Sequence, residues 1–176
     1  VAARLGLADG VAWHSRRDAI VGLGAAVGVV VGALGKLARD VALLMQREIG
    51  EVSEPQIAGR GSSSAMANKH NPTGCQVALS AAVRAPGLVA SLLAGMPQEL
   101  ERGLGGWQAE APVIGELFAL AGGAAHAMRV VVDGLEVDVA EMAAGAAAIG
   151  GDNGDAIAAA ARFVDEAIAA GVPRRD

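Results

Sequence analysis

The stretch that decides the fold is "AIVGLGAAVGVVVGALG", residues 19–35, which carries no charged side chain. A membrane-spanning helix needs about 20 apolar residues, so the run reaches only the lower limit for a span. We favour a helix buried in a soluble bundle, with a membrane span as the alternative. Gly24, Gly28 and Gly32 recur every four residues and share one helix face, which allows a second backbone to approach closely. Such a helix is expected to be buried on nearly all sides, which for a small domain suggests association with further copies.

The composition of the rest of the chain favours an all-α fold. Of the 176 residues, 53% are hydrophobic but only 2% are aromatic, and small side chains let helices pack closely. The formal net charge of −5 is spread along the chain. It therefore predicts neither a basic surface for nucleic acid nor a polybasic anchor for a membrane.

Cys75 is the only cysteine, so no disulfide can form within the chain. This fits a reducing compartment and predicts a cytoplasmic location. The first residues, "VAARLGL", lack the pattern of a secretory signal. They also lack an initiator methionine, from which we expect a fragment or a processed product of a longer protein.

Apolar periodicity predicts three long helices, over about residues 17–50, 73–95 and 107–135, with Gly50 ending the first. Pro86 is expected to kink the second helix or split it in two. The periodicity stops between residues 51 and 72, and structureless loops of this length are usually functional. No strand pattern stands out. A boundary near Val137 is expected to separate a helical bundle, residues 1–137, from a short helical tail, residues 138–176, with helical patches at 139–148 and 155–170.

The loop contains "SSSAMANKHNP", residues 62–72. A serine hydroxyl is a poor nucleophile and a poor base at neutral pH unless its neighbours activate it. The charge of Lys69, the amide of Asn71 and the backbone N–H groups near Thr73 are predicted to hold a carboxylate. They would equally hold the negative charge that develops when a proton leaves the carbon beside a carboxylate. An ordinary solvated loop with a helix cap is the alternative.

This loop, residues 53–72 at its widest, resembles the signature of the fumarase/aspartase superfamily, usually Gly-Ser-Ser-x-Met-Pro-x-Lys-x-Asn-Pro. The two serines of the signature fall on Ser63 and Ser64, while Ser62 replaces the usual glycine and Ala67 the usual proline. The flanking sequences are similar to bacterial 3-carboxy-cis,cis-muconate cycloisomerases, enzymes of the protocatechuate branch of the β-ketoadipate pathway for degrading aromatic compounds. The segments that carry this similarity are "WHSRRD" (13–18), "LGKLARDVALLMQREIGEVSEP" (34–55), residues 71–110 and "FVDEAI" (163–168). They correspond to the C-terminal part of a family member.

The resemblance implies a long-helix bundle and lactonisation of carboxymuconate, a small tricarboxylate. It implies that Ser63 acts on the proton beside a substrate carboxylate and that Lys69 and Asn71 hold substrate carboxylate. Ser64 and Met66 would shape the loop and supply backbone donors. No metal or organic cofactor is implied. Because superfamily sites combine segments from three subunits of a homotetramer, the resemblance also implies self-association and an isolated chain without activity.

Two arginines are candidates for the remaining substrate carboxylates, because a guanidinium binds a carboxylate through two hydrogen bonds. They are Arg17 and Arg102, and solvated charges at helix ends are the alternative for both. His14 is a candidate for the same substrate site, with a structural role as its alternative. His70 is expected to line the loop, and His126 to be a hydrogen-bonded histidine of the core.

Three departures from the family predict lower activity if the usual groups matter. Leu100 and Gln108 stand where the cycloisomerases tend to carry histidine, and Gln76 stands where fumarase-like relatives carry glutamate. Two alternatives to a cycloisomerase stay open. One is another lyase of the superfamily, such as an adenylosuccinate or argininosuccinate lyase, and the other is a non-catalytic helical assembly module.

Overall fold

The computed structural model describes residues 2–6, 14–57, 59–61, 70–149 and 154–171. It divides into two compact units, residues 1–138 and residues 139–176, which are described separately below. In chain order the elements are η1 (Ala2–Leu5), α1 (Asp18–Leu44), β1 (Val52–Ser53), α2 (Thr73–Ala94), α3 (Gly106–Asp133), β2 (Glu136–Val137), α4 (Val139–Ile149) and α5 (Gly154–Gly171). The prediction of an all-α bundle is confirmed.

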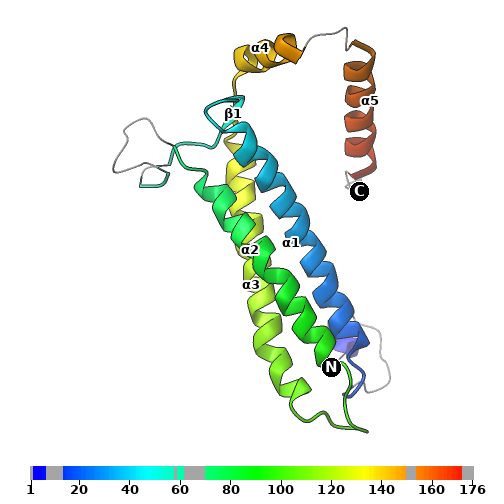
Figure 1. Ribbon diagram of the computed structural model, residues 1–176. Coiled ribbons are helices and arrows are strands. Elements are labelled where there is room, and N and C mark those ends of the chain that lie inside the picture. The colour runs from blue at the N-terminus through cyan, green and yellow to red at the C-terminus, as the bar shows by residue number, and fades with distance from the viewer. Residues whose placement is uncertain (1, 7–13, 58, 62–69, 150–153, 172–176) are drawn as a thin grey trace. The chain divides into compact units, whose positions relative to one another are not determined.

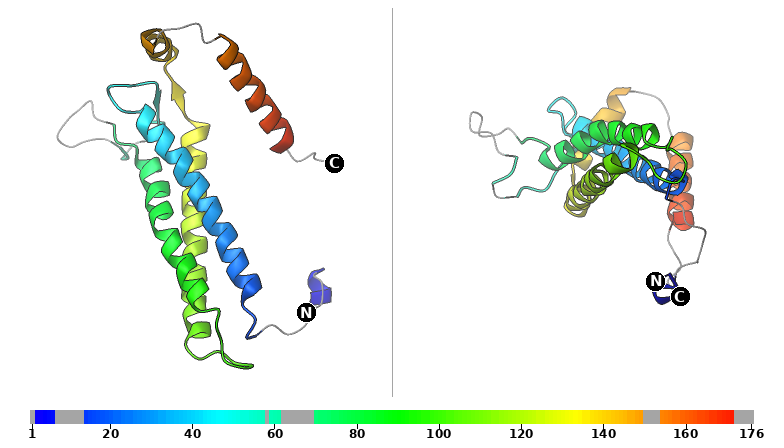
Figure 2. Two further views of the ribbon diagram at one scale, coloured as in Figure 1. Left: turned by 45° about the vertical axis from the view of Figure 1, so that its right-hand side comes forward. Right: turned by 90° about the horizontal axis from the view of Figure 1, so that it is seen from below.

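The first unit is a bundle of α1, α2 and α3 in which the chain runs up, down and up (Figures 1 and 2). Each of the three helices packs against the other two. The connection that contains the serine loop joins α1 to α2 at one end of the bundle, and the connection from α2 to α3 lies at the other end (Figure 1). Since α1 has 27 residues, these two ends are about 40 Å apart.

Small side chains form the core of this bundle. Ala78, Ala81 and Ala85 recur along one face of α2 and are almost completely buried. Leu117 and Met128 of α3 are the larger side chains that fill the space opposite. A core of alanine and glycine contacts brings helix backbones close together, so added volume in it is expected to be poorly tolerated.

The glycines predicted to form a contact face on α1 behave differently from one another. A Cβ atom built at Gly24 would overlap the Leu92 side chain of α2, and one at Gly28 would lie 2.8 Å from Cγ2 of Val89. Both glycines therefore permit close approach, as predicted. A Cβ at Gly32 would meet nothing within 4 Å, so Gly32 makes no close helix contact within one chain.

Gly35 takes over this role, because a Cβ at this buried position would overlap the Cβ of Ala82. We expect Gly35→Ala to lower the free energy of unfolding by about 1–3 kcal/mol through overpacking. The matched change Gly32→Ala should raise it by up to about 1 kcal/mol, because alanine favours a helix over glycine. Urea unfolding of the two variants measures the difference, and the same sign of change for both would contradict this packing.

Two boundaries differ from the sequence-based predictions. Helix α1 ends at Leu44 rather than at Gly50, and residues 45–49 form turns. Gly50 still ends the segment, with a φ of +66° that glycine adopts without strain. Helix α2 continues through Pro86, so the predicted split is wrong. Because α2 packs on both α1 and α3, these contacts hold it together across the hydrogen bond that proline removes.

The structure also contains a pair of short strands, which the sequence pattern did not predict. β1 and β2 are antiparallel, with Val52 opposite Val137 and Ser53 opposite Glu136. Each strand has two residues, too few for an alternating pattern to be read in the sequence. The pair ties the start of the serine-loop connection to the end of α3.

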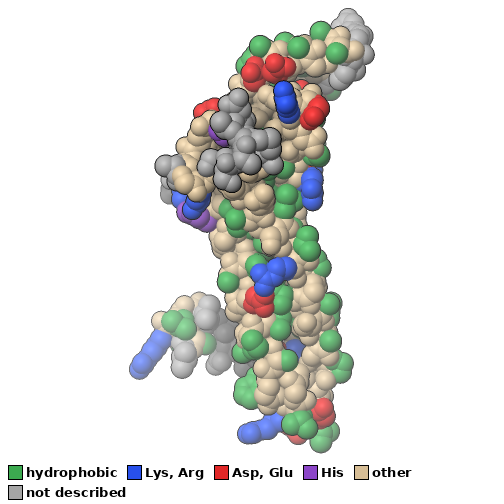
Figure 3. Space-filling view, turned by 60° about the vertical axis from the view of Figure 1, so that its left-hand side comes forward, with side chains coloured by type: hydrophobic (Ala, Val, Ile, Leu, Met, Phe, Trp, Pro, Cys, Tyr) green, Lys and Arg blue, Asp and Glu red, His purple; other side chains and the backbone are tan. Residues whose placement is uncertain are grey.

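Much apolar surface remains on the outside of the bundle. Leu23, Val29 and Val30 of α1 are 49%, 72% and 54% exposed, so the predicted burial of this helix on nearly all sides is not found within one chain. Figure 3 shows hydrophobic side chains and few charged ones along one face of the bundle. By length and composition, α1, α2 and α3 are each apolar enough to cross a membrane.

The second unit consists of α4 and α5, which coincide with the helical patches expected in the tail. Every side chain of α5 that the structure describes is exposed, including Phe163 at 71% and Ile157 at 66%.

Candidate active site

The structure describes the two ends of the serine loop. The predicted site residues Ser63, Ser64, Met66 and Lys69 lie in residues 62–69, outside the described residues. At the ends, the N–H of Asn71 donates a hydrogen bond of 2.9 Å to the carbonyl oxygen of Gly61. This bond closes the loop at its base, immediately before α2.

The first backbone N–H groups of α2 are already bound by a carboxylate from the chain itself. Glu54 accepts hydrogen bonds from the N–H of Gly74, at 2.9 Å, and of Cys75, at 2.7 Å. The N–H of Thr73 donates to the carbonyl oxygen of Asn71. These two N–H groups therefore already have a carboxylate partner in Glu54, 20 residues before Gly74 in the chain. The loop N–H groups that were predicted to hold a substrate carboxylate belong to residues 62–69, outside the described residues, and their role stays a prediction. No local motif marks Glu54, and the sequence analysis missed it.

Cys75 is fully buried under this helix start. Burial, followed by the hydrogen bond and the negative charge of Glu54, raises the pKa of the Cys75 thiol from 9.0 to about 12. The thiol is therefore protonated at neutral pH and is a poor nucleophile.

A cavity of about 400 Å³ lies beside the base of the serine loop. Its lining comes from three different parts of the chain, and the polar side chains in it are those of Glu54, Gln56, Arg60, His70, Asn71, Thr73 and His126. The size suits a small ligand, and Arg60 with the two histidines offers donors to an anion. His70 lies where it was expected. His126 is exposed and lines the cavity, so its prediction as a core histidine is wrong.

Within the described ranges, no group of three or more His, Cys, Asp or Glu side chains is placed to hold a metal ion. That the site works without a cofactor stays a prediction.

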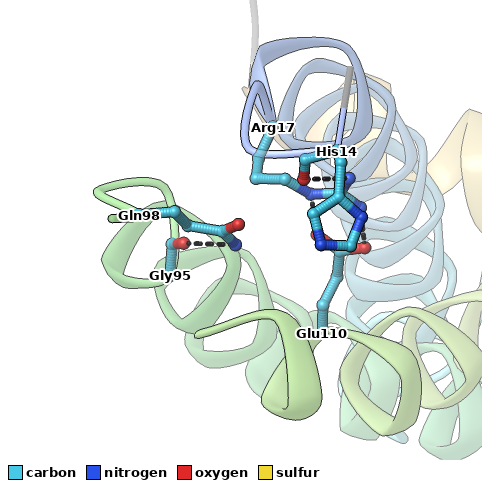
Figure 4. A network of polar contacts seen from close by, with 5 residues as sticks. All are labelled: His14, Arg17, Gly95, Gln98 and Glu110. Carbon is cyan, nitrogen blue, oxygen red and sulfur yellow. Dashed lines mark hydrogen bonds and ion pairs between the residues drawn. The ribbon is translucent and has the colours of Figure 1, made fainter. Parts of the chain in front are cut away.

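The opposite end of the bundle holds a buried ion pair between α1 and α3 (Figure 4). The Nε of Arg17 donates to Oε2 of Glu110 at 2.7 Å, its Nη2 donates to Oε1, and its Nη1 donates to the carbonyl oxygen of His14 at 3.2 Å. The two side chains are only 7% and 13% exposed. The ring of His14 packs on that of Trp107, with centroids 5.0 Å apart. In this chain Arg17 thus joins the start of α1 to the start of α3.

Two of the departures from the family lie close together, one in the connection between α2 and α3 and one in the first turn of α3. Leu100 is 88% exposed and has a φ of +42°, so it stands at a surface turn. The side chain of Gln108 accepts the N–H of Gly105 at 2.8 Å and caps α3. Arg102 is exposed in the same connection, and Gln76 is exposed in the first turn of α2.

The candidates therefore fall into two groups at opposite ends of the bundle. Asn71 lies at the cavity, whereas His14 and Arg17 directly precede α1 and Arg102 lies in the connection between α2 and α3, at the other end of the bundle. One chain does not bring them together. A substrate role for these three residues stays a prediction. It requires that the end of a second copy that carries them lies next to the serine loop of the first.

Comparison with known proteins identifies the family of the chain. A family profile described as "Lyase" matches residues 8–87. Over 130 residues the chain is 49% identical to the 3-carboxy-cis,cis-muconate cycloisomerase of Pseudomonas putida, covering 74% of this chain and 31% of the relative. The crystal structure of the lactonizing enzyme of the same organism matches 80% of this chain and 30% of that chain, with a TM-score of 0.72 and 44% identity. The chain belongs to the fumarase/aspartase superfamily.

Other members of the superfamily are also similar. The cycloisomerase of Pseudomonas aeruginosa is 52% identical over 130 residues, covering 74% of this chain and 28% of the relative. The nitrosuccinate lyase of Streptomyces davaonensis is 44% identical over 139 residues, covering 79% of this chain and 29% of the relative. The chain spans about a third of the length of the relatives that it matches. This part of the superfamily fold includes the three-helix bundle and the connection that carries the serine signature.

Proposed function

We propose that this chain supplies the serine-loop part of a 3-carboxy-cis,cis-muconate cycloisomerase, which closes carboxymuconate to a lactone in the protocatechuate branch of aromatic degradation. The observation that carries the proposal is the identity of 49% and 52% with two cycloisomerases over 130 residues. It is supported by the structural match to the lactonizing enzyme.

The proposed reaction is an internal addition. One carboxylate oxygen of the substrate attacks the substrate's own double bond, so that a C–O bond forms and the electron pair moves to the carbon beside another carboxylate. In this direction Ser63 donates a proton to that carbon, and in the reverse direction it removes the proton. The developing negative charge needs nearby donors, and we assign this to Lys69 and Asn71.

The described part of the chain supports the proposal through the cavity. Because Glu54 is held by backbone N–H groups, its charge is already partly compensated. Arg60, His70 and His126 remain as donors for a substrate with three carboxylates. These residues line the same cavity as Asn71, which lies two residues after the predicted Lys69.

We propose further that the complete site forms in a homotetramer. The candidate residues lie at opposite ends of a bundle about 40 Å long, so a second copy is needed to bring Arg17 near a serine loop. The exposed apolar side chains of α1 provide a surface for such copies. In this proposal the long apolar helices contact other subunits rather than lipid.

A chimera tests the proposed function. The matched part of the Pseudomonas putida cycloisomerase is replaced by the corresponding residues of this chain, and the purified protein is assayed for consumption of carboxymuconate. We expect clear turnover of carboxymuconate, at a rate below that of the parent enzyme if the groups replaced at Gln76, Leu100 and Gln108 matter. A folded chimera that consumes no carboxymuconate would overturn the proposal, and the unmodified parent controls for the assay.

A different lyase of the superfamily is the second candidate, favoured by the 44% identity to a nitrosuccinate lyase. The same chimera, assayed side by side with carboxymuconate, nitrosuccinate and adenylosuccinate, separates the two candidates. Preference for nitrosuccinate or adenylosuccinate would favour this second candidate. The remaining alternative is a non-catalytic assembly module. If it holds, replacing Ser63 in the chimera would leave its activity unchanged.

A further inference from the structure

We propose that Glu54 is a positioning residue for the serine loop. In this inference its carboxylate holds the N-terminus of α2, and with it Asn71, in the place that the reaction requires. It also keeps the substrate's carboxylates away from that helix end. The kinetic consequence rests on the proposed function, whereas the structural consequence does not.

The backbone on both sides of Glu54 is anchored. Before it, Ser53 pairs with Glu136 in the strand pair, and the N–H of Asp138 donates to the carbonyl oxygen of Glu51 at 2.9 Å. After it, Pro55 packs so closely on Gly134 that a Cβ there would lie 2.7 Å from Cβ of Pro55. The backbone of Glu54 is therefore fixed against the residues that follow α3, and its side chain reaches from there to the start of α2.

The helix start is shaped to receive this carboxylate. A Cβ at Gly74 would lie 3.2 Å and 3.3 Å from the two oxygens of Glu54 and would also overlap Val131. Only glycine lets α2 come this close to both groups. The carboxylate receives two charge-assisted hydrogen bonds and lies at the positive end of the helix dipole.

Asn71 is coupled to the same point through the backbone. Its carbonyl oxygen accepts the N–H of Thr73 at 2.8 Å, and its own N–H donates to Gly61. Thr73 is followed directly by the two residues that Glu54 binds. If the carboxylate is removed, the N–H groups of Gly74 and Cys75 lose their partners, and the base of the loop loses its connection to the end of α3.

Cys75 provides a built-in reporter, because it is the only thiol in the chain and lies fully buried at this point. Its pKa is raised partly by Glu54. Loss of the carboxylate is expected to increase the rate at which the thiol reacts with a disulfide reagent. A pKa lower by one unit gives about ten times more thiolate at a fixed pH.

The experiment uses the 176-residue chain with Glu54→Ala, Glu54→Gln and the control Glu48→Ala, which removes an exposed carboxylate from the turns after α1. We expect Glu54→Ala to speed amide exchange at Gly74 and Cys75 at least about tenfold and to speed the thiol reaction, with Glu48→Ala unchanged. Sodium formate should restore both in Glu54→Ala, because it can refill the vacated place. Formate should have a smaller effect on Glu54→Gln, because the glutamine amide still fills that place. Glu54→Gln also removes the charge while keeping the side-chain volume, so it is the variant less prone to unfold.

Two results would overturn the structural inference. One is unchanged exchange at Gly74 and Cys75 in both Glu54 variants. The other is an equal loss of protection at Ala78 and Val131, which would show that Glu54 acts only on overall stability.

The kinetic arm uses the active chimera described above. We expect Glu54→Gln to lower kcat about 10- to 100-fold with a smaller change in KM, as for residues that orient a catalytic group. Formate should raise the kcat of Glu54→Ala. An unchanged kcat would overturn the inference. A chimera that is inactive before Glu54 is changed would instead contradict the proposed function. In that case the amide-exchange experiment alone tests the structural role of Glu54.

Discussion

Replacing Ser63 with alanine in the active chimera is expected to lower kcat for carboxymuconate about 10²- to 10⁴-fold, which is the usual contribution of a positioned acid or base. KM should change little, because the hydroxyl acts on a proton and the carboxylates are held by other groups. Steady-state kinetics with the purified variant measure both constants.

Ser62 supplies the matched control, since it precedes the signature pair and stands where relatives usually carry glycine. Ser62→Ala should retain most of the activity. If Ser62→Ala lost as much activity as Ser63→Ala, the loss would come from loop folding. Full activity of Ser63→Ala would refute its role in proton transfer.

Replacing Glu110 with glutamine is expected to lower the free energy of unfolding by about 3–5 kcal/mol, because it leaves the buried charge of Arg17 without its carboxylate. The arginine is 7% exposed and joins α1 to α3 through two hydrogen bonds to Glu110. Urea unfolding of the 176-residue chain followed by circular dichroism measures this change.

The exposed pair between Arg84 and Glu116 is the control, because it also joins two helices but its side chains are 54% and 43% exposed. Glu116→Gln should cost no more than about 1 kcal/mol. Equal effects of the two substitutions would contradict the structural role of the buried pair. A change in KM for Glu110→Gln in the chimera, without loss of stability, would instead support the predicted substrate role of Arg17.

The sequence predicted the helices well because their apolar periodicity is long and their ends carry local signals. Thr73 was located as the start of α2 from the residues around it alone. The strand pair could not be predicted, because the two strands are short and more than 80 residues apart. The continuity of α2 through Pro86 likewise depends on packing against both neighbouring helices.

The candidate site could be predicted only where one motif contains it. Asn71 was found because it belongs to the serine signature. Glu54 was missed because it binds the helix N–H of Gly74, 20 residues later in the chain, and such a cap leaves no local pattern. His126 was assigned to the core because its neighbours are apolar, yet in the fold its position on α3 faces the cavity. The buried pair of Arg17 with Glu110 spans 93 residues and depends on the tertiary fold in the same way.

A crystal structure of the chimera with the lactone product bound tests the central claim most directly. The account predicts that Oγ of Ser63 lies about 3–3.5 Å from the carbon that gains the proton, a distance at which proton transfer is possible. Asn71 should contact a carboxylate of the same molecule. A structure in which Ser63 is enclosed by protein, away from the bound lactone, would contradict the account.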